Sequence, residues 1–174
     1  RRLVESAITP RTKAVLLNSP CNPTGAVILR EELEAIAALA IKRDLLLISD
    51  EAYESLTYDG RAHVSVASLD EEVKRRTILV NTVSKAYAMT GWRIGYAAGP
   101  AELIQAMSAI QSQVTSNPTS IAQKAAIAAL LGPQDLVLAM KAEFDRRRRY
   151  LVGRLNGIPD LRCTNPEGAF YIFL

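Results

Sequence analysis

Residues 30–51 read REELEAIAALAIKRDLLLISDE, and this stretch decides the fold class. Its first part, Arg30 to Arg43, places apolar residues on one side of a helix at spacings of three and four. Its second part, Leu45 to Ser49, is a short apolar run that predicts a buried strand ending at Asp50-Glu51. A helix that leads directly into a buried strand is the repeating unit of an α/β sheet.

The same alternation continues along the chain. Further strands are predicted at Ala14 to Leu17, Thr77 to Asn81 and Ile94 to Ala98. Helices are predicted at Glu102 to Gln113, from an N-cap at Asn117 to Gly132, and at Gln134 to Leu155. Leu161 to Leu174 is predicted to be extended, ending in a buried strand at Gly168 to Leu174. This order predicts an α/β fold with a mostly parallel sheet and flanking helices.

Composition excludes several classes of function. Of 174 residues, 49% are hydrophobic and 22% charged, as in a globular protein, and the net charge of +3 is too small to indicate nucleic-acid binding. The basic run Arg146 to Arg149 is interpreted as a solvated helix face with a few salt bridges. Cys21 and Cys163 lack CxxC spacing and His63 is the one histidine, so we expect no metal site.

Two further expectations concern the whole protein. No apolar run reaches membrane-spanning length, and the two cysteines favour a reducing compartment, so we expect no membrane partner and a cytoplasmic location. The sequence begins at Arg1 without a methionine and ends at Leu174 within its last predicted strand. We therefore expect an internal segment of a longer protein.

Polar or glycine-rich residues follow each predicted strand. In open α/β sheets, ligands bind beyond the carboxyl ends of the strands. That rule draws attention to four segments: Asn18 to Gly25, Asp50 to Tyr53, Thr82 to Lys85, and Gly91 to Gly95. We expect their side chains to meet at one site.

Taken singly, these residues have ordinary interpretations: Lys85 as a solvated lysine, Asp50 as a surface carboxylate, Asn22 as a turn residue. A desolvated lysine, however, is a nucleophile for a carbonyl. Asp50 could hold a cationic ring nitrogen. If the chain turns into a helix after Asp50, Tyr53 faces the same site. Asn22 could donate to a phenolate oxygen.

The remaining groups suit a phosphate. A guanidinium such as that of Arg93 grips phosphate through two hydrogen bonds. Thr82 and Ser84 add hydroxyl groups on one side of the chain, just before Lys85. Together, the amine, acid, phenol, amide, arginine and hydroxyls match the aldehyde, ring nitrogen, ring oxygen and phosphate of pyridoxal phosphate.

Four motifs resemble those of class I aminotransferases, in the family's order. Residues 18–25, NSPCNPTG, resemble Asn-Pro-x-Asn-Pro-Thr-Gly, and residues 50–53, DEAY, resemble Asp-x-x-Tyr. Residues 84–96, SKAYAMTGWRIGY, resemble the Ser-Lys-x5-Gly-x-Arg-x-Gly signature. Residues 166–171, PEGAFY, are similar to Pro-x-Gly-x-Phe-Tyr of the small domain. The resemblance spans essentially the whole chain.

The resemblance implies pyridoxal phosphate as cofactor and a role for each residue. Lys85 would form the Schiff base and carry protons between the substrate and the cofactor, and Asp50 would pair with the ring nitrogen. The ring oxygen would be bound by Asn22 and Tyr53, and the phosphate by Arg93, Thr82 and Ser84. It also implies that residues 1–133 are the second half of the large cofactor-binding domain. Residues 134–174 would then be the interdomain helix and the start of a small α+β domain.

Residues 116–123, SNPTSIAQ, resemble the bacterial aspartate aminotransferase subgroup within the family. Animal-type aspartate enzymes carry an arginine four residues before Ser-Asn-Pro that binds the substrate's side-chain carboxylate, whereas this sequence has Ser112. The resemblance implies amino acid and 2-oxo acid substrates, most directly aspartate and 2-oxoglutarate, and a homodimer. It also implies that the glycine-rich phosphate loop and the arginine for the substrate α-carboxylate lie outside this segment, so the segment alone is expected to be inactive.

Alternatives remain at this point. The same residues would serve a prephenate aminotransferase, another amino donor, or a carbon–sulfur lyase. Some bacterial regulators carry a non-catalytic aminotransferase-like domain fused to a DNA-binding domain. A winged-helix sequence before Arg1 would favour the regulator.

Overall fold

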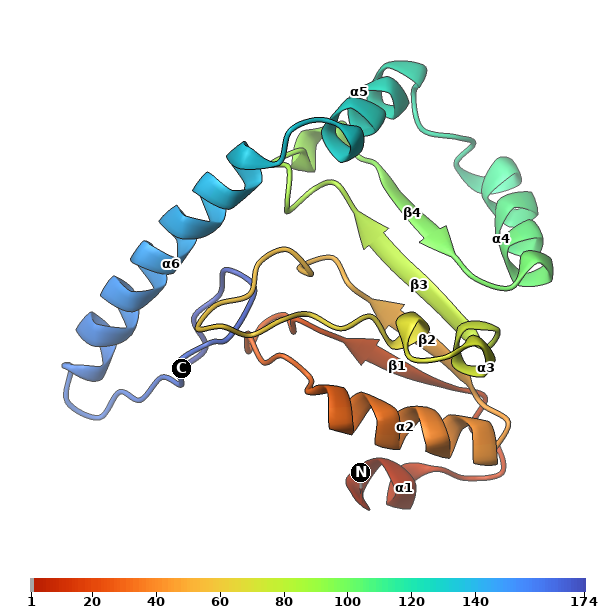
Figure 1. The fold of residues 1–174 in the computed structure, drawn as a ribbon, viewed down its shortest axis with the longest axis horizontal. Helices are drawn as coiled ribbons and strands as arrows, with labels where there is room; N and C mark the ends of the chain where they lie inside the picture. Colours follow the sequence, from red (N-terminus) through yellow and green to blue (C-terminus); the bar gives the residue numbers. More distant parts are fainter. Residues whose placement is uncertain (1) are drawn as a thin grey trace.

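A four-stranded sheet lies at the centre of the computed structural model, which describes residues 2–174. The strands are β1 (Ala14–Asn18), β2 (Leu46–Asp50), β3 (Thr77–Thr82) and β4 (Gly95–Ala98). They are ordered β1-β2-β3-β4; the first two pairings are parallel and β4 runs antiparallel to β3 (Figure 1). The predicted α/β fold is confirmed, with a mixed sheet whose one reversed strand lies at its edge.

Among residues 2–174, six helices and two short 3-10 turns connect and flank the strands. They are α1 (Arg2–Ala7), α2 (Arg30–Lys42), η1 (Val66–Ser68), α3 (Glu71–Lys74), η2 (Thr90–Trp92), α4 (Ala101–Val114), α5 (Ser120–Leu131) and α6 (Asp135–Asn156). The N-cap predicted at Asn117 is wrong. Thr119 caps α5 instead, because its hydroxyl accepts from the Ala122 N–H at 3.3 Å, whereas the Asn117 amide donates to the Pro118 carbonyl.

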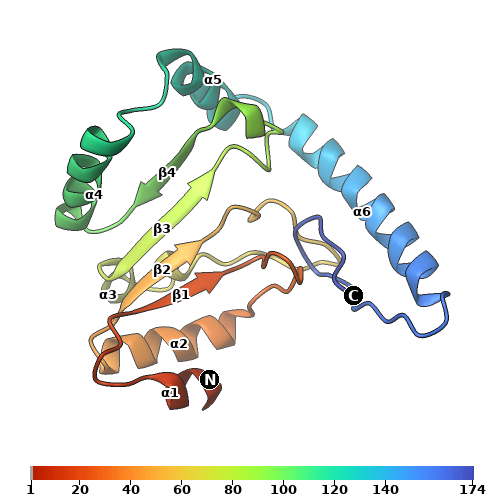
Figure 2. The ribbon, with the colours of Figure 1, turned by 180° about the vertical axis from the view of Figure 1, so that it is seen from behind.

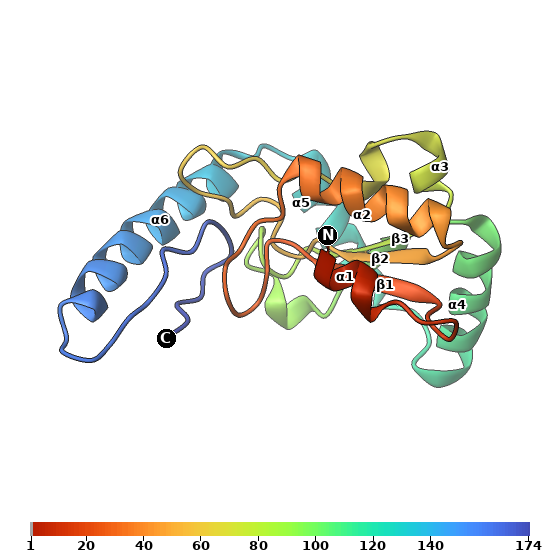
Figure 3. The same ribbon diagram turned by 90° about the horizontal axis from the view of Figure 1, so that it is seen from below.

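The main core lies between one face of the sheet and helices α2 and α3 (Figure 3). Leu17 and Leu47 on the strands pack with apolar residues of α2, such as Leu33, and with Val73 of α3. Full burial of such a side chain stabilises the fold by about 1.5–3 kcal/mol. On the opposite face Leu16 is 69% exposed, so within the described residues the sheet is covered on one side much more than on the other.

Helix α6 carries the chain away from the sheet, and the loop after it returns beside the segment that follows β2 (Figures 1 and 2). Two backbone bonds hold this return: Tyr58 N–H to the Glu167 carbonyl at 2.8 Å, and Ala169 N–H to the Leu56 carbonyl at 2.9 Å. The strand predicted at Gly168 to Leu174 is wrong. In the part of the chain described, the segment forms a single bridge, Thr57 to Gly168, because no neighbouring strand lies alongside the rest of it.

Two glycines allow the returning loop to approach the site closely. Gly25, with φ of 70°, accepts backbone hydrogen bonds from Glu167 and Gly168 at 2.9 and 2.8 Å. A Cβ at Gly25 would collide with Pro166, and one at Gly168 would collide with Pro20. Both contacts need a residue without a side chain.

None of the described helices is by itself long and apolar enough to cross a membrane. Helices α5 and α6 meet that test only as a pair, and the pair is bent by 81°.

Candidate functional site

The ends of β1 and β2 hold Asp50 in place. Asn18 and Asp50 are aligned as the last residues of their strands, and the Asn18 amide donates to Asp50 Oδ2 at 3.1 Å. The backbone N–H of Ala52 donates to Oδ1 at 3.2 Å. Asp50 is half-buried, and its two bonds leave acceptor positions for a further donor. The chain beyond it forms tight turns, so the helix considered after Asp50 does not occur.

Tyr53, Asn22 and Tyr171 form a cluster of hydrogen-bonding groups, called here the phenol cluster. The hydroxyl oxygens of Tyr53 and Tyr171 are 2.5 Å apart, and the Asn22 amide donates to the Tyr171 hydroxyl at 3.3 Å. Burial raises the pKa of Tyr53, and the neighbouring Tyr171 and Asp50 raise it further. Tyr53 is therefore a neutral phenol at physiological pH and can donate a hydrogen bond.

Lys85 lies in the turn that follows β3. The turn is closed by backbone bonds from Tyr87 to Val83 and from Ala88 to Lys85, both 3.3 Å. The Lys85 side chain is half-buried, and its Nζ lies 5.8 Å from the centre of the Tyr53 ring. The ends of β2 and β3 thus bring the predicted amine next to the predicted phenol.

Thr82 and Ser84 form a second group beside Lys85, called here the hydroxyl turn. The Thr82 hydroxyl lies 2.8 Å from both the Ser84 hydroxyl and the Ile94 carbonyl, and it accepts from the Ser84 N–H at 3.1 Å. Val83 between them is 1% exposed and points into a small core with Met89 and Ala126. The sequence prediction that the two hydroxyls share one side is consistent with this geometry.

Arg93 follows the short turn η2 and is exposed. It has a left-handed backbone, with φ of 53°, and its exposed guanidinium donates to the Thr90 carbonyl at 2.9 Å. Among the described contacts none joins Arg93 to Thr82, Ser84 or Lys85. It lines an open surface hollow of about 480 Å³ together with Asn117, Pro118 and Thr119. Four of its five N–H donors are left for an anion.

Comparison with known proteins decides the family. The model of the family "Aminotransferase class I and II" matches residues 2–174. The chain belongs to this aminotransferase family. The aspartate aminotransferase of Geobacillus stearothermophilus is 52% identical over 170 residues, which are 98% of this chain and 43% of that protein. The aspartate/prephenate aminotransferase of Cereibacter sphaeroides is 50% identical, with the same two coverages.

A solved structure also matches the fold. The crystal structure of the aspartate aminotransferase from Rhizobium meliloti superposes with a TM-score of 0.95 at 50% identity, over 98% of this chain and 43% of that one. The chain thus spans less than half the length of the aminotransferases it matches.

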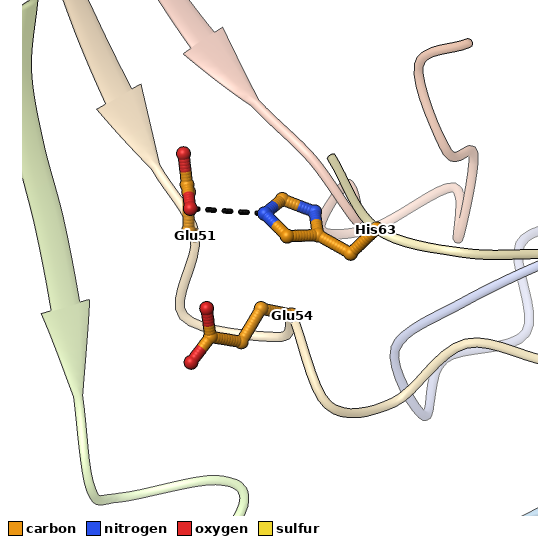
Figure 4. A group of neighbouring side chains, drawn as sticks. All are labelled: Glu51, Glu54 and His63. Carbon is orange, nitrogen blue, oxygen red and sulfur yellow. Dashed lines mark hydrogen bonds and ion pairs between the residues drawn. The ribbon is translucent and has the colours of Figure 1, made fainter. Parts of the chain in front are cut away.

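A partly buried hydrogen bond joins Glu51 and His63 next to the candidate site. Glu51, between Asp50 and Tyr53 in the sequence, is 1% exposed and accepts from Ser49, Ser65 and His63 Nε2 at 2.8, 2.8 and 2.9 Å (Figure 4). Burial would raise the pKa of the Glu51 carboxyl, but these three bonds outweigh burial and lower it.

Glu54 approaches the same pair, and the ligand atoms of Glu51, Glu54 and His63 all lie within 4.8 Å of one another. Both Glu51 oxygens are already bonded, and Nδ1 of His63 points away from the carboxylates (Figure 4). The contact between Glu51 and His63 is therefore described as a partly buried hydrogen bond. A lone histidine gave no signal in the sequence for a buried partner twelve residues away.

Arg148 corrects the prediction for the basic run. Arg146, Arg147 and Arg149 are exposed, but Arg148 is 5% exposed and lies over the Tyr58 ring at 4.8 Å. It donates to both oxygens of Asp59 at 2.7 and 2.8 Å and to Asp145 at 2.8 Å. It also donates to Asn165 and the Pro166 carbonyl at 2.9 and 2.8 Å.

The interpretation of the run as a solvated face with a few salt bridges was wrong for Arg148 alone, because its partners outside α6 lie 17 to 89 residues away in the chain. The Arg148 network fastens α6 to the turn after Tyr58 and to the loop that carries Tyr171. Tyr171 was itself missed as a site residue: its motif indicated a buried strand, which gave no reason to expect its hydroxyl beside Tyr53.

Proposed function

We propose that the whole protein is a pyridoxal-phosphate-dependent aminotransferase that acts on aspartate and 2-oxoglutarate. The observation that carries this proposal is the meeting of three groups at the carboxyl ends of β2 and β3. The Lys85 amine lies over the Tyr53 ring, and Asp50 precedes Tyr53 on the neighbouring turn. Family membership and the names of the relatives support the reaction class.

The donor set suits the cofactor. Asp50 retains acceptor positions for a protonated ring nitrogen, and the neutral phenol of Tyr53 with the Asn22 amide can donate to a ring oxygen. Arg93, Thr82 and Ser84 are groups that bind phosphate elsewhere in proteins. When bound, the cofactor supplies an electron-withdrawing ring that stabilises negative charge on the substrate α-carbon.

Each residue of this chain has a defined task in the proposal. Lys85 would hold the cofactor covalently through Nζ. Once the substrate amine has displaced it, the freed Lys85 amine would move a proton from the substrate α-carbon to the cofactor carbon that it had been bonded to. Asp50 keeps the proton on the ring nitrogen. Asn22 and Tyr53 orient the ring and favour its ionised oxygen.

The proposed identity of the amino donor is taken from the names of the relatives. Aspartate appears in the names of several of them, and prephenate appears with it in the name of the Cereibacter sphaeroides relative. Prephenate is therefore the second candidate substrate. We also propose a homodimer; α4 buries none of its own residues here and exposes Met107, Ile110 and Val114, which suits an apolar contact.

The test uses the full-length protein. Borohydride reduction followed by peptide mapping is expected to place the pyridoxyl group on Lys85, and a label on another lysine would refute the assignment. Incubation with aspartate and 2-oxoglutarate is expected to yield glutamate. Glutamate formed only when prephenate's amination product serves as donor would move the assignment to the second candidate. Light scattering reports the oligomeric state.

A further inference from the structure

The Tyr171 hydroxyl contacts both groups that the proposed function assigns to the ring oxygen. It lies 2.5 Å from the Tyr53 hydroxyl and accepts from the Asn22 amide at 3.3 Å. We propose that Tyr171 is a positioning residue that acts through Tyr53: its hydroxyl donates to Tyr53 and so turns the Tyr53 proton toward the cofactor's ring oxygen. This inference rests on the proposed function, because it concerns the same site.

Hydrogen-bond accounting gives the direction of each bond. A phenol carries one hydrogen and accepts through its lone pairs. Only one hydrogen can lie between the two hydroxyls. If Tyr53 donates its hydrogen to the ring oxygen, the hydrogen between the two phenols must belong to Tyr171. Tyr171 in turn accepts from Asn22, so the chain of donors runs from Asn22 through Tyr171 to Tyr53.

Donors in such a chain strengthen one another. A phenol that accepts a hydrogen bond becomes a better donor, by about 10–30% per bond in condensed-phase estimates. A stronger bond from Tyr53 stabilises the ionised ring oxygen. Tyr171 is thus expected to change the ionisation of the bound cofactor without touching it.

The fold holds Tyr171 firmly in this position. Ala169, two residues earlier, is fully buried; its N–H donates to Leu56 and its carbonyl accepts from the Tyr58 hydroxyl at 2.6 Å. Ala169 has a left-handed backbone with φ of 57°, a conformation that costs a non-glycine residue about 1–3 kcal/mol.

Aromatic packing completes the support. The Tyr53 and Tyr171 rings meet edge to face with centres 5.6 Å apart, and Phe170 stacks on Phe144 of α6 at 5.2 Å. Upstream, the Arg148 network holds Asn165 and Pro166. These contacts fix the loop that carries Tyr171 and so hold the Tyr171 hydroxyl in one position, as a positioning role requires.

The experiment compares Tyr171→Phe with wild type in the full-length holoenzyme. Phenylalanine keeps the ring packing and removes the hydroxyl. The readouts are the pH midpoint of the absorbance change of the bound cofactor and the dissociation constant of pyridoxal phosphate. We expect the midpoint to rise by about 0.5–1 pH unit and the dissociation constant to increase by about 3–10-fold, the effect of one hydrogen bond. Tyr150→Phe, a 64% exposed tyrosine on α6, is the matched control and should change neither.

A double-mutant cycle separates positioning from general damage. In a Tyr53→Phe background, Tyr171→Phe should have little further effect on the midpoint, because its route to the cofactor is already gone. An unchanged midpoint in the single variant, tighter cofactor binding, or a full additional shift in the double variant would each overturn the inference. Wild-type protein that shows no cofactor absorbance band would instead overturn the proposed function, and this inference with it.

Discussion

The phenol cluster and the hydroxyl turn lie on either side of Lys85 and are built in different ways. In the phenol cluster, Tyr171 bonds to partners 118 and 149 residues away in the chain. In the hydroxyl turn, Thr82 bonds to partners two and twelve residues away. The first group is assembled by the packing of α6 and its following loop, and the second by the local course of β3 and β4. The two sides should therefore respond differently to mutation: the hydroxyl turn to local changes, the phenol cluster also to distant ones.

Lys85, between the two groups, should give the largest effect. Lys85→Ala in the full-length protein is expected to reduce kcat by about 10⁴-fold or more, because it removes both the covalent link and the proton carrier. Steady-state kinetics with aspartate measure the change. Lys124→Ala, an exposed lysine on α5, is the control and should retain wild-type turnover. If the kcat of Lys85→Ala stays within tenfold of the wild-type value, the proposed roles of Lys85 are refuted.

Asp50 tests the β2 end of the site. Asp50→Asn keeps the size of the side chain and is expected to leave the cofactor bound while kcat falls by on the order of 10³-fold, because a neutral amide does not hold the proton on the ring nitrogen. Single-turnover kinetics and cofactor content measure the two effects separately. Near-normal turnover would contradict the proposed role.

Arg148 tests whether distant packing maintains the phenol cluster. Arg148→Met removes a buried charge that satisfies five oxygen acceptors, and is expected to lower the free energy of unfolding by about 3–5 kcal/mol. Urea unfolding of the full-length protein measures it. Arg147→Met breaks only an exposed pair with Glu143 and should change stability little. Equal effects of the two variants would mean that the Arg148 network does not stabilise the loop.

Glu51 gives the smallest expected effect, and it depends on pH. The folded-state pKa of Glu51 is lowered, so its ionised form adds stability above the pKa of the unfolded chain, and this stability is lost as pH falls through the folded-state pKa. The wild type should therefore lose stability in acid more steeply than Glu51→Gln, by about 1–3 kcal/mol between pH 7 and acid. Urea midpoints across pH 3 to 7 test this. Parallel curves for the two proteins would show that the ionised Glu51 carboxylate does not stabilise the fold.

The features that were predicted from the sequence are those that depend on residues close together in the chain. The apolar runs placed all four strands within about a residue, and the polar strand ends pointed to Asp50 and Lys85. The direction of β4 was not predicted, because an apolar run has the same pattern in either direction. Tyr171, the Glu51–His63 pair and the buried state of Arg148 all depend on partners that only the folded chain brings close. In a run of four arginines, the sequence does not indicate which side chain will be buried.

Arg148 also links the opening of α6 to the opening of the loop that carries Tyr171. Its guanidinium donates to oxygens on α6, on the turn at Asp59 and on the loop at Asn165 and Pro166, so the opening of any one of these segments breaks hydrogen bonds of a buried cation. Their amides should then exchange with solvent deuterium as one cooperative unit. The N–H of Ala169 should exchange at the rate set by the opening of α6. The Tyr171 hydroxyl therefore lies beside Tyr53 only while α6 is packed against the turn at Asp59 and the loop at Asn165.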